Sequence, residues 1–200
     1  MNAISSYTIV KAWNFKDYLR KEVNFWKDWL SEGENYSCGI YEVDQLARVN
    51  LCLIKSFMSW DNYALPGGLS DGYPWSHWPV DAWTCYYALT LWGHLDDAKN
   101  YLGTFVKKVT EYIKANSLNL YKSIHICNLI DYTTTQGNYA SEACFLLPIV
   151  AVETWKKAKS DSTFRDNIWS WIQTFMDEID GDLITYGDWK DHFDLSLIHI

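Results

Sequence analysis

Acidic and aromatic residues crowd into one stretch of the chain, from Gly67 to Gly93, with the sequence GGLSDGYPWSHWPVDAWTCYYALTLWG. Its first half holds Asp71, Tyr73, Trp75, His77, Trp78 and Asp81, and Asp61 precedes it. Flat indole and phenol rings stack on the apolar faces of sugar rings, and carboxylates accept hydrogen bonds from the hydroxyl groups at their edges. We therefore predict a carbohydrate-binding site. The alternative is that these large side chains only fill a helical core.

The second half of this stretch predicts a buried helix. Pro79 suits the first helical position, where no backbone N–H is needed, and Gly93 suits a left-handed residue after the helix end. The residues between them leave no polar face: Trp83, Cys85, Tyr86, Tyr87, Ala88, Leu89, Leu91 and Trp92. A helix that is apolar on every side packs inside a protein, so we expect the aromatic loop to lie at the mouth of an enclosed space.

Hydrophobic periodicity predicts further helices along the chain. Amphipathic helices, each with one apolar face, are expected over 14–31, 42–60, 95–116 and 162–179. A second strongly apolar helix, which contains Pro148, is expected over 139–159. The expected buried stripe of 42–60 is Val43, Leu46, Ala47, Ile54, Phe57 and Met58, and that of 162–179 is Phe164, Ile168, Trp169, Ile172, Phe175 and Ile179. Residues 117–138 predict a short strand or ribbon, and Asp180, Gly181 and Asp182 predict a turn.

The order of these elements is regular: a one-sided helix, a long link, an apolar helix, a short turn, then the same again. Two concentric rings of antiparallel helices give this order, with the long links gathered at one end of the inner ring. We predict an all-α fold that is part of an α/α toroid. A repeat solenoid ranks lower because the segments share no residue-level repeat.

Composition excludes several classes of function. The net charge of -8 provides no basic surface for a nucleic acid, and no basic amphipathic helix for a membrane surface is present. The longest apolar run, 143–152, is about half of a membrane span, and the N-terminus lacks an export signal, which favours the cytoplasm. The five cysteines are odd in number and widely spaced, which predicts reduced packing residues, no zinc and no cofactor.

Several stretches resemble the (α/α)6 six-hairpin glycosidases, in particular the glucoamylase-like group and its relatives among trehalases and glycogen-debranching enzymes. They are FWKDWL (25–30), ARVNLCLIKSF (47–57), GYPWSHWPVDAWTCYYALTLWGHLDDAKNYL (72–102), GNYASEACFLLPIVAVETW (137–155) and DGDLI (180–184). The third is similar to that group's aromatic loop, Trp-Pro-Arg-Asp, apolar helix and turn. The resemblance implies an (α/α)6 toroid acting on oligosaccharides or polysaccharides.

The resemblance also implies more helices than the chain holds, so we expect a partial catalytic domain. Residues 14–31 would be the helix before the toroid and 42–194 the toroid helices and loops. The closing LSLIHI, residues 195–200, is similar to translated sequencing adapter and is discounted as native sequence. Met1 is interpreted as an internal start, since the resembling enzymes commonly carry a β-sandwich upstream.

One departure from the family concerns substrate recognition. Where the family has Arg followed by Asp to hold sugar hydroxyls, this chain has Val80 followed by Asp81. Loss of the guanidinium removes a bidentate, charged hydrogen-bond donor. Asp81 still offers two acceptor oxygens for hydroxyl groups. Its alternative role is that of a carboxylate favoured by the dipole in any first helical turn.

Hydrolysis with inversion needs a carboxylic acid that protonates the leaving oxygen and a carboxylate that activates water. In GDWKD, Asp188 and Asp191 flank Trp189, similar to motifs of debranching enzymes and toroidal phosphorylases in which the second Asp is the acid. The resemblance implies this role for Asp191. Burial beside Trp189 would raise the pKa of such an acid. The alternative is a solvated acidic loop. The base is expected outside this chain.

Other residues are assigned to sugar contact. The predicted set is Trp75, Trp78 and Trp189 for stacking, with Tyr73, Asp81, His77 and Glu142 for polar contacts. His77 is more typical of a loop hydrogen-bonder than of a catalyst, and Glu142 is equally explained as a helix N-terminal charge.

Three hypotheses follow. The first is an inverting glycoside hydrolase that cleaves α-glucosidic bonds. The second is a catalytically silent carbohydrate-binding toroid, which Val80 and the missing base favour. The third is another α/α-toroid enzyme, a phosphorylase or a polysaccharide lyase.

Overall fold

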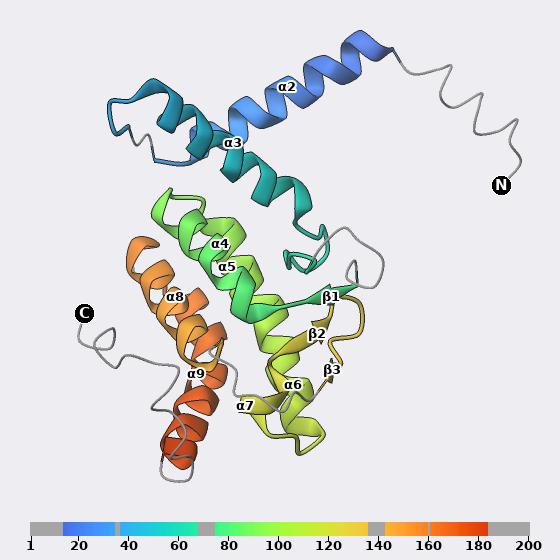
Figure 1. The fold of residues 1–200 in the computed structure, drawn as a ribbon, viewed down its shortest axis with the longest axis vertical. Coiled ribbons are helices and arrows are strands. Elements are labelled where there is room, and N and C mark those ends of the chain that lie inside the picture. The colour runs from blue at the N-terminus through green and yellow to red at the C-terminus, as the bar shows by residue number, and fades with distance from the viewer. Residues whose placement is uncertain (1–13, 35–36, 68–74, 136–142, 160, 184–200) are drawn as a thin grey trace, which may run out of the picture.

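The computed structural model describes residues 14–34, 37–67, 75–135, 143–159 and 161–183 (Figure 1). It is mostly helical, which confirms the predicted all-α class. Its helices are α2 (Phe15–Glu32), α3 (Tyr41–Phe57), α4 (Pro79–Leu91), α5 (Leu95–Asn100), the π-helical η1 (Tyr101–Val106), α6 (Lys107–Ala115), α7 (Leu120–Ser123), α8 (Ala143–Lys157) and α9 (Ser162–Leu183). Its strands are β1 (Ser76–His77), β2 (Ile126–Asn128) and β3 (Thr134–Thr135).

Both ends of α4 lie where the sequence predicts them. Pro79 is its first helical residue. At its other end Gly93 has a φ of +82°, the His94 N–H donates to the Leu89 carbonyl at 2.9 Å, and the Gly93 N–H donates to the Thr90 carbonyl at 3.2 Å. These two bonds form a Schellman motif, which satisfies carbonyls that the last helical turn leaves open.

Helix α4 is the centre of the described helices, packed against α3, α5 and α8. Near their C-terminal ends α4 and α8 are joined by a Thr90–Thr154 hydroxyl hydrogen bond of 2.7 Å and by the Lys157 ammonium, which donates to the Leu91 carbonyl at 2.8 Å. The two apolar helices therefore run parallel. Burial is not complete on every side, because Trp83 and Cys85 are half-buried and Leu91 is exposed.

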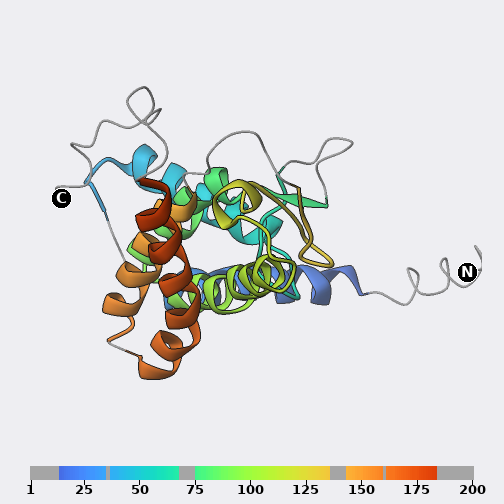
Figure 2. The ribbon, with the colours of Figure 1, turned by 90° about the horizontal axis from the view of Figure 1, so that it is seen from below.

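Helices α5, η1 and α6 form one continuous rod, as predicted for 95–116, but with a π-helical middle. The predicted apolar face of this rod is confirmed, since Ala98, Leu102, Phe105, Val109 and Ile113 are buried. Tyr101 in η1 stacks on Tyr86 of α4 with ring centroids 3.5 Å apart. The stacked pair joins α4 to the rod in the core. Helices α8 and α9 lie side by side (Figures 1 and 2).

The buried faces of α2 and α3 differ from the prediction, and that of α9 differs at one predicted residue. In α3 the stripe residues Val43, Leu46 and Phe57 are exposed, and Leu51 is buried instead. In α9 the predicted stripe residues Phe164, Ile168, Ile172 and Phe175 are buried as predicted, whereas Trp169 is exposed and Trp171 is buried. In α2 the predicted face is exposed at Phe15, Tyr18 and Leu19, half-buried at Glu22, Trp26 and Leu30, and buried at Trp29. An apolar side chain is buried only where a neighbouring element packs against it.

The connections keep the predicted alternation of long and short. Residues 92–94 and 158–161 are the short turns that follow α4 and α8, whereas 58–78 and 116–142 are long links that precede them. Link 116–142 contains the predicted ribbon, β2 and β3. Two boundaries are wrong: α3 ends at Phe57 rather than Trp60, and α9 continues through Gly181 to Leu183, where a turn was predicted.

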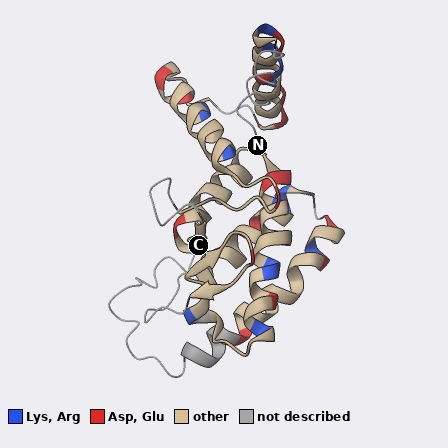
Figure 3. Ribbon diagram, turned by 90° about the vertical axis from the view of Figure 1, so that its right-hand side faces the viewer, with Lys and Arg blue, Asp and Glu red and all other residues tan. Residues whose placement is uncertain are grey.

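All five cysteines are free, as predicted, and no helix among the described residues is long and apolar enough to cross a membrane. Figure 3 shows basic and acidic residues interspersed along the ribbon rather than gathered on one basic face.

Candidate functional site

The links that enter α4 and α8 define one end of this helix pair, which we call the link end. The opposite end, where Leu91 and Lys157 leave the pair, is the turn end. At the link end β1, which precedes α4, pairs antiparallel with β2, and β2 pairs with β3. Ser76 faces Asn128 and His77 faces Cys127 in this register. The ribbon therefore ties the link before α4 to the link that follows α6.

His77 is buried at the base of this ribbon. Its Nδ1 lies 2.6 Å from the Leu65 carbonyl and its Nε2 lies 2.7 Å from the Tyr101 hydroxyl. Because a carbonyl only accepts, Nδ1 carries the proton and Nε2 accepts from Tyr101. Burial lowers the pKa of His77 to about 4. His77 thus holds the link to the rod as a neutral ring and has no exposed surface, so the predicted sugar contact of His77 is wrong for this structure.

Two further buried polar groups hold the same link. The Tyr86 hydroxyl donates to the Tyr63 carbonyl at 2.7 Å. The Asn62 side-chain amide donates to the Leu129 carbonyl at 2.6 Å, and the Leu129 N–H donates to the Trp75 carbonyl at 2.9 Å. Long-range hydrogen bonds at buried positions are costly to break, so these bonds fix the described segments around Asn62, Trp75 and Leu129 against one another.

Trp78 is half-buried, directly before α4. Its ring lies edge-to-face on His125, with ring centroids 5.3 Å apart. A Cβ added at Gly67 would lie 2.5 Å from the Trp78 ring, so glycine is required there, and the Gly67 N–H donates to the Ser76 carbonyl at 2.6 Å. The other predicted stacking residue of the described chain, Trp75, is 65% exposed. Trp75 has the open ring face that stacking on a sugar requires.

Asp81 lies in the first turn of α4 and is exposed. Within the described part of the chain its carboxylate has no hydrogen bond or ion pair, so its oxygens face solvent at the link end. The position also agrees with the alternative role, a carboxylate favoured by the helix dipole. Val80, the residue before Asp81, is half-buried.

The predicted catalytic residues Asp188 and Asp191 lie outside the described residues, as do Trp189, Tyr73 and Glu142. Of the predicted site residues in the described chain, Trp75, Trp78 and Asp81 follow one another from the residue before β1 to the first turn of α4, and His77 between them is buried.

The carboxyl groups with a resolved pKa shift do not provide a proton donor. Hydrogen bonds from Ser37 and the Cys38 N–H lower the pKa of Asp44, those from the Thr133 side chain and N–H lower that of Asp131, and those from Phe164 and Lys99 lower that of Asp161. A general acid needs a raised pKa. Among the described residues no group of His, Cys, Asp and Glu could hold a metal ion.

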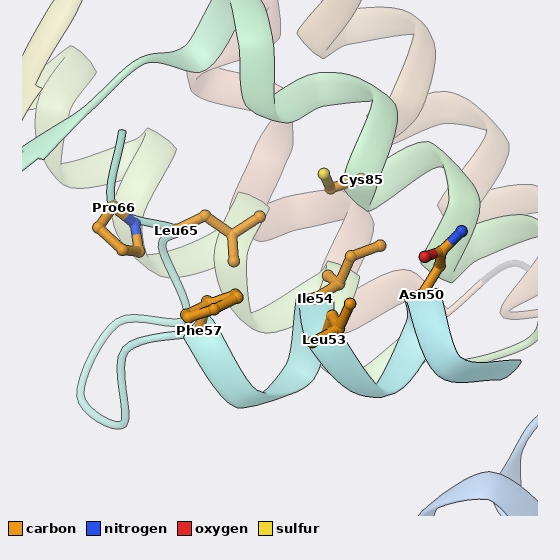
Figure 4. Close-up of a pocket in the computed structure, with 7 residues that line it drawn as sticks. All are labelled: Asn50, Leu53, Ile54, Phe57, Leu65, Pro66 and Cys85. Atoms are coloured by element: carbon orange, nitrogen blue, oxygen red, sulfur yellow. The ribbon is translucent and has the colours of Figure 1, made fainter. Parts of the chain in front are cut away.

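An apolar surface groove of about 490 Å³ lies elsewhere, between α3 and α4, and is lined by Asn50, Leu53, Ile54, Phe57, Leu65, Pro66 and Cys85 (Figure 4). None of these described lining residues is a carboxylate. Another cavity, of about 390 Å³, lies at the turn end and includes Gly33, Arg48 and His94.

Sequence reasoning missed two residues that the link end displays to solvent, Trp60 and Ile130, which are 90% and 67% exposed. Trp60 was placed inside a helix. The residues that follow it, Asp61 and Asn62, are typical turn residues, and this pattern could have indicated that the helix ends before Trp60.

Comparison with known proteins gives no assignment: no family model, curated protein or solved structure matches the chain.

Proposed function

We propose that this chain forms the substrate-binding end of an inverting glycoside hydrolase that cleaves α-glucosidic bonds in oligosaccharides. The observation that carries the proposal is the arrangement of α4 and α8. They are parallel apolar helices, each entered through a long link and left through a short turn, and the link that follows α6 is tied to the link before α4 by the β1–β2 pairing.

The proposed fold is two successive outer–inner helix pairs of an (α/α)6 toroid, followed by a third outer helix. In it α4 and α8 belong to the inner ring, and α3, the α5–η1–α6 rod and α9 belong to the outer ring. The open apolar groove on the α3–α4 flank and the exposed Trp169 of α9 support this arrangement, because a ring needs an apolar face on both flanks to continue.

In the proposed mechanism the link end binds the sugar and places its glycosidic oxygen near the proton donor. Trp75 and Trp78 contact sugar ring faces, and the Asp81 carboxylate accepts hydrogen bonds from hydroxyl groups. Asp191 donates its proton to the leaving oxygen as the bond to the anomeric carbon breaks. A second carboxylate takes a proton from the water that attacks the opposite face, which inverts the anomeric configuration.

The test uses the protein expressed from its complete open reading frame, with maltotriose as substrate. Proton NMR of the first product should show β-configured glucose, because inversion of an α-linkage gives the β-anomer. Asp191→Asn should lower turnover by roughly 100-fold or more while maltotriose binding persists. Asp166→Asn, an exposed carboxylate on α9 outside the predicted site, is the control and should keep the wild-type rate. An unchanged rate for Asp191→Asn would remove that residue from the role.

A second candidate is a carbohydrate-binding toroid without hydrolysis. Val80, in the place where the resembling enzymes have Arg, favours it. Binding of maltotriose by the complete gene product with no release of glucose would decide for this candidate. Restoring the basic residue by Val80→Arg tests whether its guanidinium is what activity lacks.

A further inference from the structure

We propose that Trp60 and Ile130, together with Trp75 of the sugar site, form an outer binding platform that extends the sugar site at the link end along a polysaccharide chain. This inference deepens the proposed function and rests on it for the identity of the polymer, an α-glucan. The existence of the platform itself is inferred separately, from hydrogen bonds to Leu129 and from the exposure of the three side chains.

The three side chains are displayed from segments that are tied together at one residue, Leu129. The Leu129 carbonyl accepts from Asn62, two residues after Trp60, and the Leu129 N–H donates to the Trp75 carbonyl. Ile130 is the next residue along the chain. The backbone therefore brings together segments that are far apart in sequence, and each of them carries a large apolar side chain that is at least 65% exposed.

The turn that carries Trp60 is held rigidly. Its ends are joined because the Ser59 N–H donates to the Ala64 carbonyl at 2.9 Å and the Tyr63 N–H donates to the Ser59 carbonyl at 3.0 Å. The Ala64 N–H also donates to the Asn62 side chain at 3.0 Å, and Asn62 is buried. An exposed indole on a rigid turn loses little conformational entropy when it binds a ligand.

The turn that carries Ile130 is held in a similar way by Asn128. Its side-chain oxygen accepts from the Ile130 N–H at 2.7 Å and from the Asp131 N–H at 3.3 Å. Tyr132 in this turn and Tyr63 in the other have φ angles of +64° and +61°. Bulky residues rarely adopt positive φ, and such strain persists where the surrounding structure holds a functional geometry.

The chemistry of the platform fits a sugar polymer better than a protein. Exposed carboxylates follow the apolar side chains directly, Asp61 after Trp60 and Asp131 after Ile130. Carboxylates next to open ring faces complement hydroxylated, flat ligands. Two tryptophans bury about 150–250 Å² each, which is well below the roughly 800 Å² that each partner of a stable protein–protein complex buries. A chain of a few sugar rings matches the smaller area.

Affinity electrophoresis of the 200-residue protein in gels that contain glycogen tests the proposal, with mixed-linkage β-glucan as the second polymer. Glycogen should retard the wild type, and Trp60→Ala and Trp75→Ala should each weaken binding by roughly tenfold. Trp169→Ala is the matched control, because Trp169 is 55% exposed on α9, outside the platform. Far-UV circular dichroism checks that each variant is folded.

Unchanged retardation of Trp60→Ala, or no retardation of the wild type by either polymer, would overturn the platform. So would a dimer in sedimentation that Trp60→Ala disrupts, because it would assign the surface to a second copy of the chain. Binding of β-glucan alone, lost in Trp60→Ala, would keep the platform and contradict the α-glucosidic substrate. Inverting hydrolysis of maltotriose together with unchanged polymer binding would contradict the platform and leave the proposed function intact.

Discussion

Two buried histidines flank α4 at opposite ends, and they are held in different ways. His77 at the link end uses both ring nitrogens, one toward the Leu65 carbonyl and one toward the Tyr101 hydroxyl. His94 at the turn end stacks flat on Trp29, with ring centroids 3.8 Å apart. Its Nδ1 is buried and has no hydrogen-bond partner among the described residues.

The difference shows which end of the helix pair must keep a fixed geometry. Stacking holds a ring against a surface without fixing which atoms meet, whereas two hydrogen bonds fix the position of both partners. At the link end the partners of His77 are the Leu65 carbonyl of the link before α4 and the Tyr101 hydroxyl of the rod. His77 therefore fixes the position of the segment that carries Trp75, Trp78 and Asp81. At the turn end Trp29 is held by Asp97, whose carboxylate accepts from its indole N–H at 2.9 Å.

The largest expected effect is that of His77→Phe. It leaves the Leu65 carbonyl and the Tyr101 hydroxyl buried without a partner, at about 1–3 kcal/mol each, so the free energy of unfolding should fall by about 4 kcal/mol. Urea unfolding followed by circular dichroism at pH 7 measures the loss. His77→Gln is the control, since an amide also offers a donor and an acceptor, and should recover part of the stability. A loss below about 1 kcal/mol would show that these hydrogen bonds do not fix the link end.

The same histidine predicts the pH dependence of stability. Because burial lowers the His77 pKa from 6.5 to about 4, the unfolded chain takes up a proton below pH 6.5 and the folded protein does not. Stability should therefore fall as pH falls from 6.5 to 4, by about 3 kcal/mol. The pKa values of Asp131 and Asp161 are lowered from 3.8, so these groups act below this window.

Urea unfolding at pH 7, 5.5 and 4.5 measures this slope. Burial also lowers the pKa of His94, opposed by the nearby Asp97 charge and reinforced by Lys55, so its contribution has the same sign. In His77→Gln most of the slope should disappear. If the variant keeps the full slope of the wild type, the pH dependence belongs to His94 or to other groups.

The sequence predicts the helices because their causes are local. Pro79 and Gly93 mark the ends of α4 through the conformations that they allow, and the apolar period marks the buried face of the α5–η1–α6 rod. The face of α3 is mispredicted because more than one apolar stripe is available on this helix, whereas the face of α9 is confirmed among its described side chains except at Trp169. Which stripe is buried depends on what packs against it, and only the fold decides that.

The site is predicted less completely for the same reason. The sequence alone predicts that Trp75, Trp78 and Asp81 lie near one another, because they are close along the chain. The role of His77 depends on partners 12 and 24 residues away, and the tie between Trp75 and Leu129 spans a longer distance along the chain. No local sequence pattern encodes such pairs. The sequence therefore does not predict the long-range hydrogen bonds that fix these segments, nor the exposure of Trp60.

The smallest expected effect, His94→Phe, tests the other half of the comparison. A phenyl ring keeps the stack on Trp29 and removes a buried nitrogen that has no partner among the described residues, and His94 lines the cavity of about 390 Å³ at this end. The free energy of unfolding should change by less than about 1 kcal/mol in the same urea experiment. A loss as large as that of His77→Phe would mean that His94 is also fixed by hydrogen bonding. The two ends of α4 would then be equally constrained, and rigidity would no longer single out the link end as the place where a ligand binds.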